Sequence, residues 1–176
     1  SWALFRAAFD ECSRATNRSI AMAVSSCGPT NNASDGDAPG CARWVARGDV
    51  RADLWRTGGD IQATWSSVVA NVDSNDAMAP AQSRGHWNDA DLLEVGNDGG
   101  LNLVESRSQL SLWAMLASPM LLSTDLRKLL LPRQAAVLAL LRNEGVLPAT
   151  VSLSQLLAPG PFHCGLCGQS ISLPSM

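Results

Sequence analysis

Two short segments of the chain place carboxylates and a guanidinium where they could carry out acid–base chemistry. The first is residues 55–61 (WRTGGDI), and the second, about thirty residues later, is residues 85–93 (GHWNDADLL). Each is a short β-like run that ends in glycine and carboxylates directly before a helix-patterned stretch. Catalytic groups at the carboxyl ends of the strands of a (β/α) barrel are arranged in this way. The two segments therefore indicate a site that uses carboxyl groups as acid, base or nucleophile.

Asp60 and Arg56 each allow a structural and a chemical interpretation. An Asp between a strand end and a helix start can be an N-cap, whose side chain accepts hydrogen bonds from free backbone N–H groups. Arg56 precedes Asp60 by four residues. It can form an ordinary surface salt bridge, or its planar guanidinium can donate paired hydrogen bonds to a ligand. The two residues on their own leave both interpretations open.

The hydrophobic pattern alternates between helix and strand along the chain. It predicts helices over residues 2–12, after Asp60, around Leu110 and from Pro132 to about residue 142. Buried strands are expected at residues 20–25, 50–55 and 120–123, and a further strand, third in chain order, is expected to end around residues 87–92. Residues 26–40 should form an exposed loop. The expected buried face of the helix after Asp60 comprises Ile61, Trp65, Val68, Val69 and Val72. That of the next helix comprises Leu110, Trp113, Ala114 and Ala117.

Strands and helices that alternate with short connections favour parallel βαβ units and an α/β fold. A closed (β/α)8 barrel usually needs about 250 residues and eight strands. The four expected strands and the length of 176 residues supply about half of that. We therefore expect a partial (β/α)8 TIM barrel.

Composition excludes several classes of partner. Hydrophobic residues make up 46% of the chain, and the net charge is −3 with no run of like charge. This pattern fits one globular unit and provides no basic patch for nucleic acid or an anionic membrane. The apolar runs are well below the roughly 20 residues that a bilayer-spanning helix requires. The first residues mix charged and apolar side chains, so we do not expect a signal peptide there.

The cysteines give little support for a metal site. They are five in number: Cys12, Cys27, Cys41, Cys164 and Cys167. Cys27 and Cys41 flank the loop rich in Gly, Asn and Asp, where a disulfide would restrain the chain if the Cα spacing allows it. The last two have zinc-like spacing, but the chain lacks the second pair that would complete a tetrahedral site. We expect neither a metal nor another cofactor.

The two motifs closely resemble the clan D glycoside hydrolases of family 27, the α-galactosidases and α-N-acetylgalactosaminidases. Residues 111–127 agree, since they resemble the seventh helix and eighth strand of that family's barrel. The resemblance implies that the chain contains approximately strands 5 to 8 of the barrel with their helices. On this basis we expect residues 1–147 to be the C-terminal half of the barrel. Residues 148–176 diverge from the family pattern, and we expect a poorly ordered tail there.

The resemblance also implies roles for individual residues. By its place in the motif, Asp60 resembles the family's catalytic acid/base, and Arg56 resembles the arginine that binds the 2-substituent of the sugar. Asp91 matches a carboxylate that lines the pocket, where its negative charge would favour the protonated form of Asp60. Asp89 is expected to hold its loop through backbone hydrogen bonds. Trp87 is either an apolar platform for a sugar face or a packing residue.

Specificity depends on the end of the first strand. At this position the α-galactosidases of animals and plants carry a Glu that binds the sugar 2-hydroxyl. By the resemblance, Ser25 takes the place of that Glu in this chain. The smaller side chain leaves room for an acetamido group. His86 stands where the family usually has glycine, and we expect only a solvated or loop-bonded side chain there.

The family resemblance implies a retaining hydrolase that releases terminal α-linked galactose from oligosaccharides or glycoconjugates. The closest alternative is an α-N-acetylgalactosaminidase, and the others are a non-catalytic galactose-binding module and an inactive fragment. The family's nucleophile is the Asp of a Lys-Tyr-Asp segment, and the present sequence has no tyrosine. We therefore expect this chain alone to be inactive. A homodimer of the full-length protein and a secreted, vacuolar or lysosomal location are further expectations from the resemblance.

Overall fold

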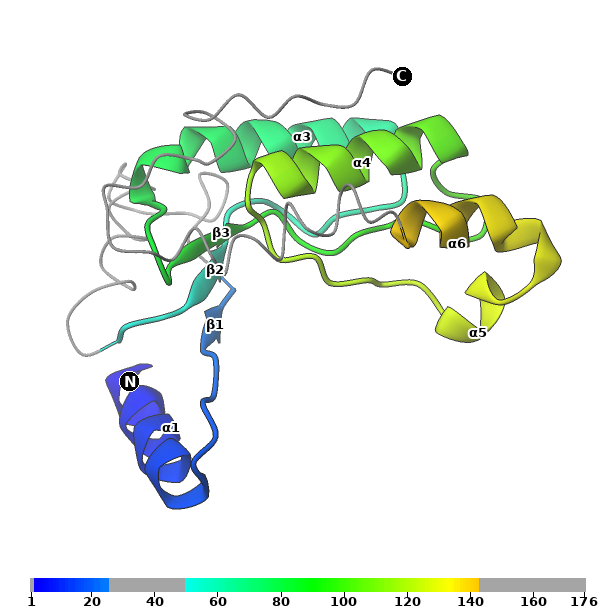
Figure 1. Cartoon of the computed structure of the whole chain (residues 1–176). Coiled ribbons are helices and arrows are strands. Elements are labelled where there is room, and N and C mark those ends of the chain that lie inside the picture. The colour runs from blue at the N-terminus through cyan, green and yellow to red at the C-terminus, as the bar shows by residue number, and fades with distance from the viewer. Residues whose placement is uncertain (1, 26–49, 143–176) are drawn as a thin grey trace, which may run out of the picture.

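The computed structural model describes residues 2–25 and 50–142, and these form a parallel sheet covered by helices (Figure 1). The sheet has the order β1-β2-β3, with β1 at Ala23–Val24, β2 at Leu54–Arg56 and β3 at Trp87–Asp89. The predicted strand at residues 120–123 is present only as an isolated parallel bridge between Leu93 and Leu122. Parallel pairing between strands far apart in sequence is as expected for βαβ units.

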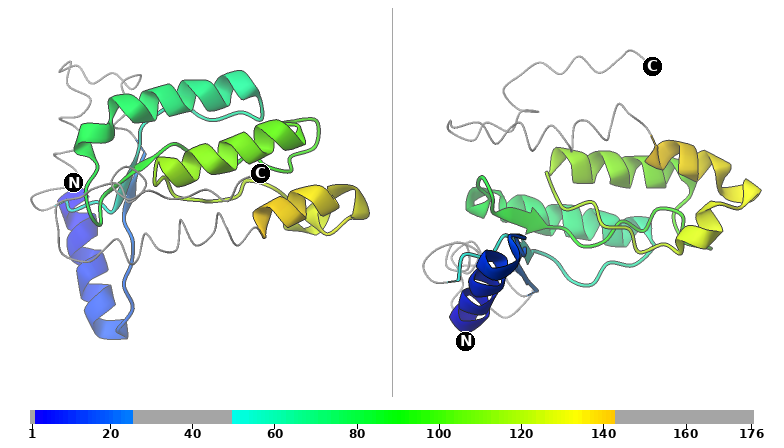
Figure 2. Two further views of the ribbon diagram at one scale, coloured as in Figure 1. Left: turned by 45° about the horizontal axis from the view of Figure 1, so that its top comes forward. Right: turned by 60° about the horizontal axis from the view of Figure 1, so that its bottom comes forward.

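Helices connect and cover the strands. Helix α3 is Trp65–Ala77 and α4 is Leu103–Met115, and the two lie side by side over one face of the sheet (Figures 1 and 2). Helices α5 (Leu126–Leu129) and α6 (Ala135–Leu141) follow at one end, with a short 3-10 turn at Pro132–Gln134 between them. Another 3-10 turn, Ala79–Ala81, follows α3. Pro132 stands at the start of its turn, where the lost N–H is not needed.

The helix after Asp60 begins later than its hydrophobic pattern predicts. Thr64 is the N-cap of α3, and its side chain accepts a hydrogen bond from the Ser67 backbone N–H. Ile61 therefore lies in the strand-to-helix loop. Trp65 and Val69, predicted to be buried, are exposed. Val68 is buried as predicted, and Ile61 and Val72 pack against the same cluster. The other buried residues of α3 are Asn71 and Asn75.

The helix around Leu110 is close to its prediction. Asn102 and Glu105 form a reciprocal capping box at the start of α4, with hydrogen bonds from the Val104 and Glu105 backbone N–H groups to the Asn102 side chain. Leu110, Trp113 and Ala114 are buried as expected. Ala117 lies beyond the helix, with a φ of 52°, so its predicted place on the buried face is wrong.

Two hydrophobic clusters lie between the sheet and the helices. One surrounds Trp55, and the other surrounds Trp113; both indole rings are fully buried. The Trp55 Nε1–H donates to the Asn88 Oδ1 atom over 2.7 Å, so β2 and β3 are joined by a side-chain bond as well as by the ladder. Asn88 in turn donates to the Met78 carbonyl at 2.9 Å. A buried polar group with all its partners resists any shift of register.

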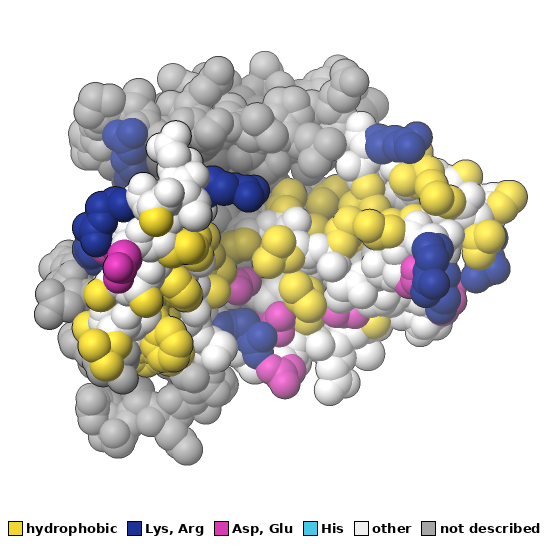
Figure 3. Space-filling view, turned by 90° about the horizontal axis from the view of Figure 1, so that it is seen from below, with side chains coloured by type: hydrophobic (Ala, Val, Ile, Leu, Met, Phe, Trp, Pro, Cys, Tyr) yellow, Lys and Arg dark blue, Asp and Glu magenta, His cyan; other side chains and the backbone are white. Residues whose placement is uncertain are grey.

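Helix α1, Trp2–Thr16, is longer than predicted and has no buried residue. Its exposed hydrophobic side chains include Trp2, Leu4 and Phe5. The face seen in Figure 3 carries many hydrophobic side chains, with acidic and basic ones between them. Within residues 2–25 and 50–142, no helix is both long and apolar enough to cross a bilayer. The predicted Cys27–Cys41 bridge, the Cys164 and Cys167 pair and the divergent tail lie outside the described residues.

Two glycines at the turn between β3 and α4 provide a test of the packing. Gly96 has a φ of +86°, and a Cβ there would lie 2.7 Å from the Leu129 Cδ2 atom. Gly99 has a φ of +73° with no atom within 4 Å of the same position. Both alanine variants suffer the backbone penalty of about 1 kcal/mol, but only Gly96→Ala adds an overpacking cost of about 1–3 kcal/mol. Urea unfolding should show the larger loss for Gly96→Ala; equal losses would contradict the packing at Leu129.

Candidate active site

The parallel register brings the chemical residues of different strands to one edge of the sheet. Arg56 on β2 is the register partner of Asp89 on β3. Ser25 directly follows Val24, which is the partner of Trp55, so Ser25 lies level with Arg56. Since side chains alternate along a strand, Val24 and Trp55 face the helices while Ser25 and Arg56 face away from them. Three neighbouring strand ends thus contribute to one surface.

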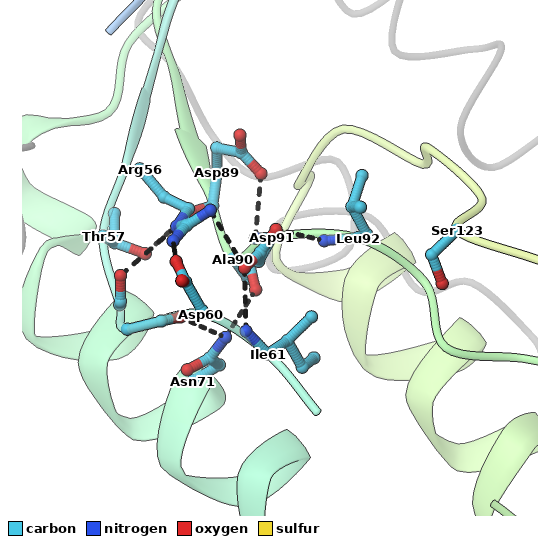
Figure 4. Close-up of polar contacts among 12 residues, drawn as sticks. Arg56, Thr57, Asp60, Ile61, Asn71, Asp89, Ala90, Asp91, Leu92 and Ser123 are labelled. Carbon is cyan, nitrogen blue, oxygen red and sulfur yellow. Dashed lines mark hydrogen bonds and ion pairs between the residues drawn. The ribbon is translucent and has the colours of Figure 1, made fainter. Parts of the chain in front are cut away.

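The guanidinium of Arg56 lies between the carboxylates of Asp60 and Asp91 (Figure 4). Its Nη1 atom is 3.0 Å from the Asp91 Oδ2 atom, and its Nη2 atom is in contact with the Asp60 Oδ1 atom. The Nε–H donates to the Gly58 carbonyl over 3.3 Å. The cation offsets the repulsion between the two carboxylates that the sequence led us to expect.

The two carboxylates differ strongly in exposure. The side chain of Asp60 is 94% exposed, that of Arg56 is 21% exposed and that of Asp91 is 9% exposed. The N-cap interpretation of Asp60 is wrong, because Thr64 caps α3. The Asp60 carboxylate is therefore open to solvent at this edge, whereas the Asp91 carboxylate lies behind Arg56 and is largely buried.

Asp91 is held in a strained conformation by its neighbours. Its φ is 78°, in the left-handed region that costs a non-glycine residue about 1–2 kcal/mol. The Asp91 Oδ2 atom accepts the Ile61 N–H over 2.8 Å, and its Oδ1 atom accepts the Leu92 N–H over 2.9 Å. The buried Trp113 Nε1–H donates to the Asp91 carbonyl over 2.7 Å. Backbone strain of this kind is concentrated at functional sites, where the surrounding structure maintains it.

Asp89 holds the same loop, as predicted. Its Oδ1 atom accepts the backbone N–H of Asp91 over 2.9 Å. Burial raises the pKa of Asp89 above its ordinary value, and the nearby Asp91 charge adds to that rise. The hydrogen bond from the Asp91 backbone and the Arg56 charge act in the opposite direction on the pKa of Asp89. The site thus combines the exposed carboxylate of Asp60, the buried carboxylate of Asp91 and the partly buried carboxylate of Asp89.

Buried polar residues that the sequence did not single out support the two loops. Asn71 on α3 donates from its side-chain Nδ2 atom to the carbonyls of Gly59, over 3.2 Å, and Ala90, over 3.0 Å. The Ala90 N–H donates to the Ser118 Oγ atom over 2.8 Å. The only available signal for Asn71 was its helical spacing from Val68, which placed a polar residue on the buried face.

The remaining predicted residues lie at different depths. Trp87 is two residues before Asp89 on β3 and is paired with Leu54, on the sheet face that carries Arg56. His86 is loop-bonded, as expected: its Nδ1 atom lies 2.7 Å from the Ala52 carbonyl oxygen, and its ring stacks on Trp55. The described part of the chain contains no group of three or more His, Cys, Asp or Glu side chains that could hold a metal ion.

Comparison with known proteins gives one consistent family. The sequence profile described as alpha galactosidase A matches residues 3–149. The chain is 39% identical over 123 residues to the α-N-acetylgalactosaminidase of Gallus gallus, covering 68% of this chain and 29% of that protein. It is 42% identical over 88 residues to the α-galactosidase of Oryza sativa subsp. japonica, covering 50% of this chain and 20% of that protein. The chain thus spans less than a third of the length of these curated relatives.

A solved structure supports the fold. The α-galactosidase from Saccharomyces cerevisiae with raffinose superimposes with a TM-score of 0.64 at 21% sequence identity. The superposition covers 85% of this chain and 33% of that enzyme. The described sheet and helices therefore correspond to part of a larger enzyme fold.

The raised pKa of Asp89 leads to a prediction about stability. The folded protein holds the Asp89 proton more tightly than the unfolded chain, whose Asp pKa is about 3.9, so ionised Asp89 lowers stability above the folded pKa. Asp89→Asn keeps an acceptor for the Asp91 N–H and cannot ionise. Urea titration should show a higher free energy of unfolding than wild type at pH 7. This gain should shrink as the pH falls through the folded pKa.

Asp98→Asn is the matched control for this titration. The hydrogen bond and charge of Lys128 lower the pKa of Asp98, so its contribution to stability is present at neutral pH and is lost in acid. The variant should therefore lose stability at pH 7 and approach wild type as the pH falls. A loss of stability at pH 7 for both variants would contradict the account of Asp89.

Proposed function

We propose a function for this chain on the premise that it belongs to the alpha galactosidase A family, whose profile matches residues 3–149. The proposed activity of the whole protein is retaining hydrolysis of terminal α-linked galactose, with Asp60 as the acid/base. The observation that carries the assignment is the position of Asp60, an exposed carboxylate at the carboxyl ends of parallel strands, in contact with the half-buried Arg56. Catalytic groups of (β/α)8 barrels lie at this edge.

In the proposed mechanism, Asp60 acts twice. It donates a proton to the glycosidic oxygen as the bond to the aglycone breaks, and it then removes a proton from the water that releases the sugar. Arg56 binds the 2-substituent, Asp91 keeps the guanidinium in place, and Trp87 lies deeper on the same sheet face as an apolar surface. A second carboxylate about 5 Å from the first must act as nucleophile. That group is not assigned to any residue of this chain, so we propose that residues 2–142 alone do not turn over substrate.

The place of the chain in the barrel is part of the proposal. We assign β1, β2, β3 and the bridge at Leu122 to strands 5 to 8. The parallel order β1-β2-β3 and the pairing of Leu93 with Leu122 support this assignment, because they give four consecutive parallel positions. Residues 1–147 would then be the C-terminal half of the catalytic barrel.

An α-N-acetylgalactosaminidase is the second candidate. Ser25 is exposed and lies level with Arg56, and a small side chain there leaves space beside the guanidinium for an acetamido group. The similarity to the enzyme of Gallus gallus is in keeping with this alternative. The α-galactoside substrate, a homodimer of the whole protein and a secreted, vacuolar or lysosomal location remain predictions from the family.

Asp60→Asn tests the acid/base assignment in the full-length protein that contains this segment. Loss of the proton donor should lower kcat/KM for methyl α-galactoside by about 100-fold to 10,000-fold. The loss should be much smaller for 2,4-dinitrophenyl α-galactoside, because an acidic leaving group departs without protonation. The measurement is kcat/KM for the two substrates, since it reports on the first step, before Asp60 acts as a base.

The control for this experiment is Asp98→Asn, which removes a carboxylate paired with Lys128 away from the site. It should leave both rates at the wild-type value. Undiminished release of methyl galactoside by Asp60→Asn would overturn the assignment. Galactose binding by calorimetry without any turnover in the wild type would instead favour a sugar-binding module.

Ser25→Glu tests the specificity proposal. A Glu beside Arg56 should occupy the space for an acetamido group and accept a hydrogen bond from a free 2-hydroxyl. The ratio of kcat/KM for nitrophenyl α-galactoside to that for the N-acetyl substrate should rise at least about tenfold. Ser108→Glu, on α4, adds the same charge outside the site and should not change the ratio. An unchanged ratio in Ser25→Glu would remove Ser25 from the pocket.

A further inference from the structure

We propose that Asn71 is a positioning residue whose single amide group fixes the acid/base Asp60 relative to Asp91. The inference rests on the proposed function, since it concerns how the same site is held. Asn71 lies on α3, outside both motifs, and is 4% exposed. Its role therefore depends only on contacts that it makes beneath the two loops.

The side-chain amide of Asn71 binds both loops at equivalent points. One Nδ2 hydrogen is donated to the Gly59 carbonyl, over 3.2 Å, and the other to the Ala90 carbonyl, over 3.0 Å. Gly59 immediately precedes Asp60, and Ala90 immediately precedes Asp91. Each carbonyl belongs to the peptide plane from which the next residue's side chain projects. One planar group thus bonds to both peptide planes; Figure 4 shows Asn71 with these hydrogen bonds.

The ion pair above the amide is too weak to fix this spacing, and the direct bond between the loops, from the Ile61 N–H to the Asp91 Oδ2 atom over 2.8 Å, holds the peptide after Asp60 and not the one before it. The ion pair of Arg56 with Asp60 involves a carboxylate that is 94% exposed, and such pairs are weak and screened by salt. A sugar that binds Arg56 would also compete with Asp60 for the guanidinium. The Asn71 bond to the Ala90 carbonyl is buried, so that carbonyl would be left without a replacement from water if the donor were lost, and the bond to the Gly59 carbonyl is part-buried.

Close packing at Gly58 restricts the amide further. A Cβ at Gly58 would lie 2.8 Å from the Asn71 Oδ1 atom, too close for an unmoved side chain. At Gly59 the same addition meets no atom within 4 Å. The two adjacent glycines therefore offer a way to displace the amide without removing it, with a control one residue away.

The catalytic consequence follows from the sensitivity of proton transfer to geometry. A misplacement of about 1 Å can cost about 100-fold in rate. A displaced Asp60 protonates the leaving oxygen less well, so poor leaving groups suffer more than good ones. The ratio of kcat/KM for 2,4-dinitrophenyl α-galactoside to that for methyl α-galactoside, called the rate ratio below, measures this effect. The ratio does not depend on how much of a variant is folded.

The main experiment compares Asn71→Leu with Asn75→Leu in the full-length protein. Asn75 is as deeply buried, lies one helical turn further along α3, and its Nδ2 atom has no hydrogen-bond partner among the described residues. We expect the rate ratio to rise about tenfold or more in Asn71→Leu, within the loss that such misplacement produces. Asn75→Leu should keep the wild-type ratio. Equal ratios in the two variants would overturn the proposal.

Gly58→Ala provides a second route if Asn71→Leu does not fold. The added methyl group should push the Asn71 amide away from the loops and raise the rate ratio in the same direction, though less. Gly59→Ala should leave the amide undisturbed and the ratio near the wild-type value. A wild-type ratio in Gly58→Ala would argue against the proposal.

Hydrogen exchange separates this inference from the proposed function. The Ile61 N–H donates from the first loop to the Asp91 Oδ2 atom of the second, so it reports on the spacing of the loops. The Asp91 N–H donates to the Asp89 Oδ1 atom and reports on the second loop. Both amides should exchange faster in Asn71→Leu and at the wild-type rate in Asn75→Leu, whatever the catalytic activity. If the wild type shows no turnover, the proposed function fails, and the exchange rates still decide whether Asn71 holds the loops. Unchanged exchange in Asn71→Leu would refute the role of the amide.

Discussion

The register between β2 and β3 is the constraint on which the site depends. Trp55 and Asn88 are register partners, and their side chains share a buried hydrogen bond on the helix side of the sheet. Because successive residues of a strand face opposite sides, this bond places Arg56 opposite Asp89 on the other side. A shift by one residue would bury the guanidinium among the hydrophobic residues around Trp55 and expose the indole. The hydrophobic core therefore determines which charged groups meet.

The three carboxylates near Arg56 differ in their exposure to solvent and in their contacts. Arg56 contacts both Asp60 and Asp91, but only Asp60 is open to solvent. Asp89 is set apart, since it is turned to the backbone of Asp91 and its pKa is raised by burial. The left-handed backbone at Asp91 is maintained by Trp113, a residue of the second hydrophobic cluster. Each cluster thus supports one of the two motif-bearing loops.

The structure of the described residues is consistent with their match to one part of longer relatives. It contains a parallel sheet with helices on one face, and the hydrophobic side chains of α1 remain exposed. A sheet of this kind is normally covered on both faces or closed into a barrel. The curated relatives that it matches are more than three times as long as the matched part. Catalysis by a retaining mechanism requires a second carboxylate as nucleophile. Because no residue of this chain is assigned to that role, we propose the activity for the whole protein only.

The sequence by itself determined the element types, the fold class and the membership of the family. Helical and strand periodicities are local, and the two motifs are contiguous, so both are readable without coordinates. It misjudged Trp65 and Val69, because the buried face of α3 is centred on Val68, Asn71 and Asn75, and a hydrophobic pattern does not detect the two buried asparagines. Only the tertiary structure decided that Asp60 is not an N-cap, that Arg56 joins two carboxylates and that Asn71 bridges both loops. These contacts join residues up to 35 positions apart along the chain, and their geometry depends on the packing of α3 against the sheet, which no local pattern encodes.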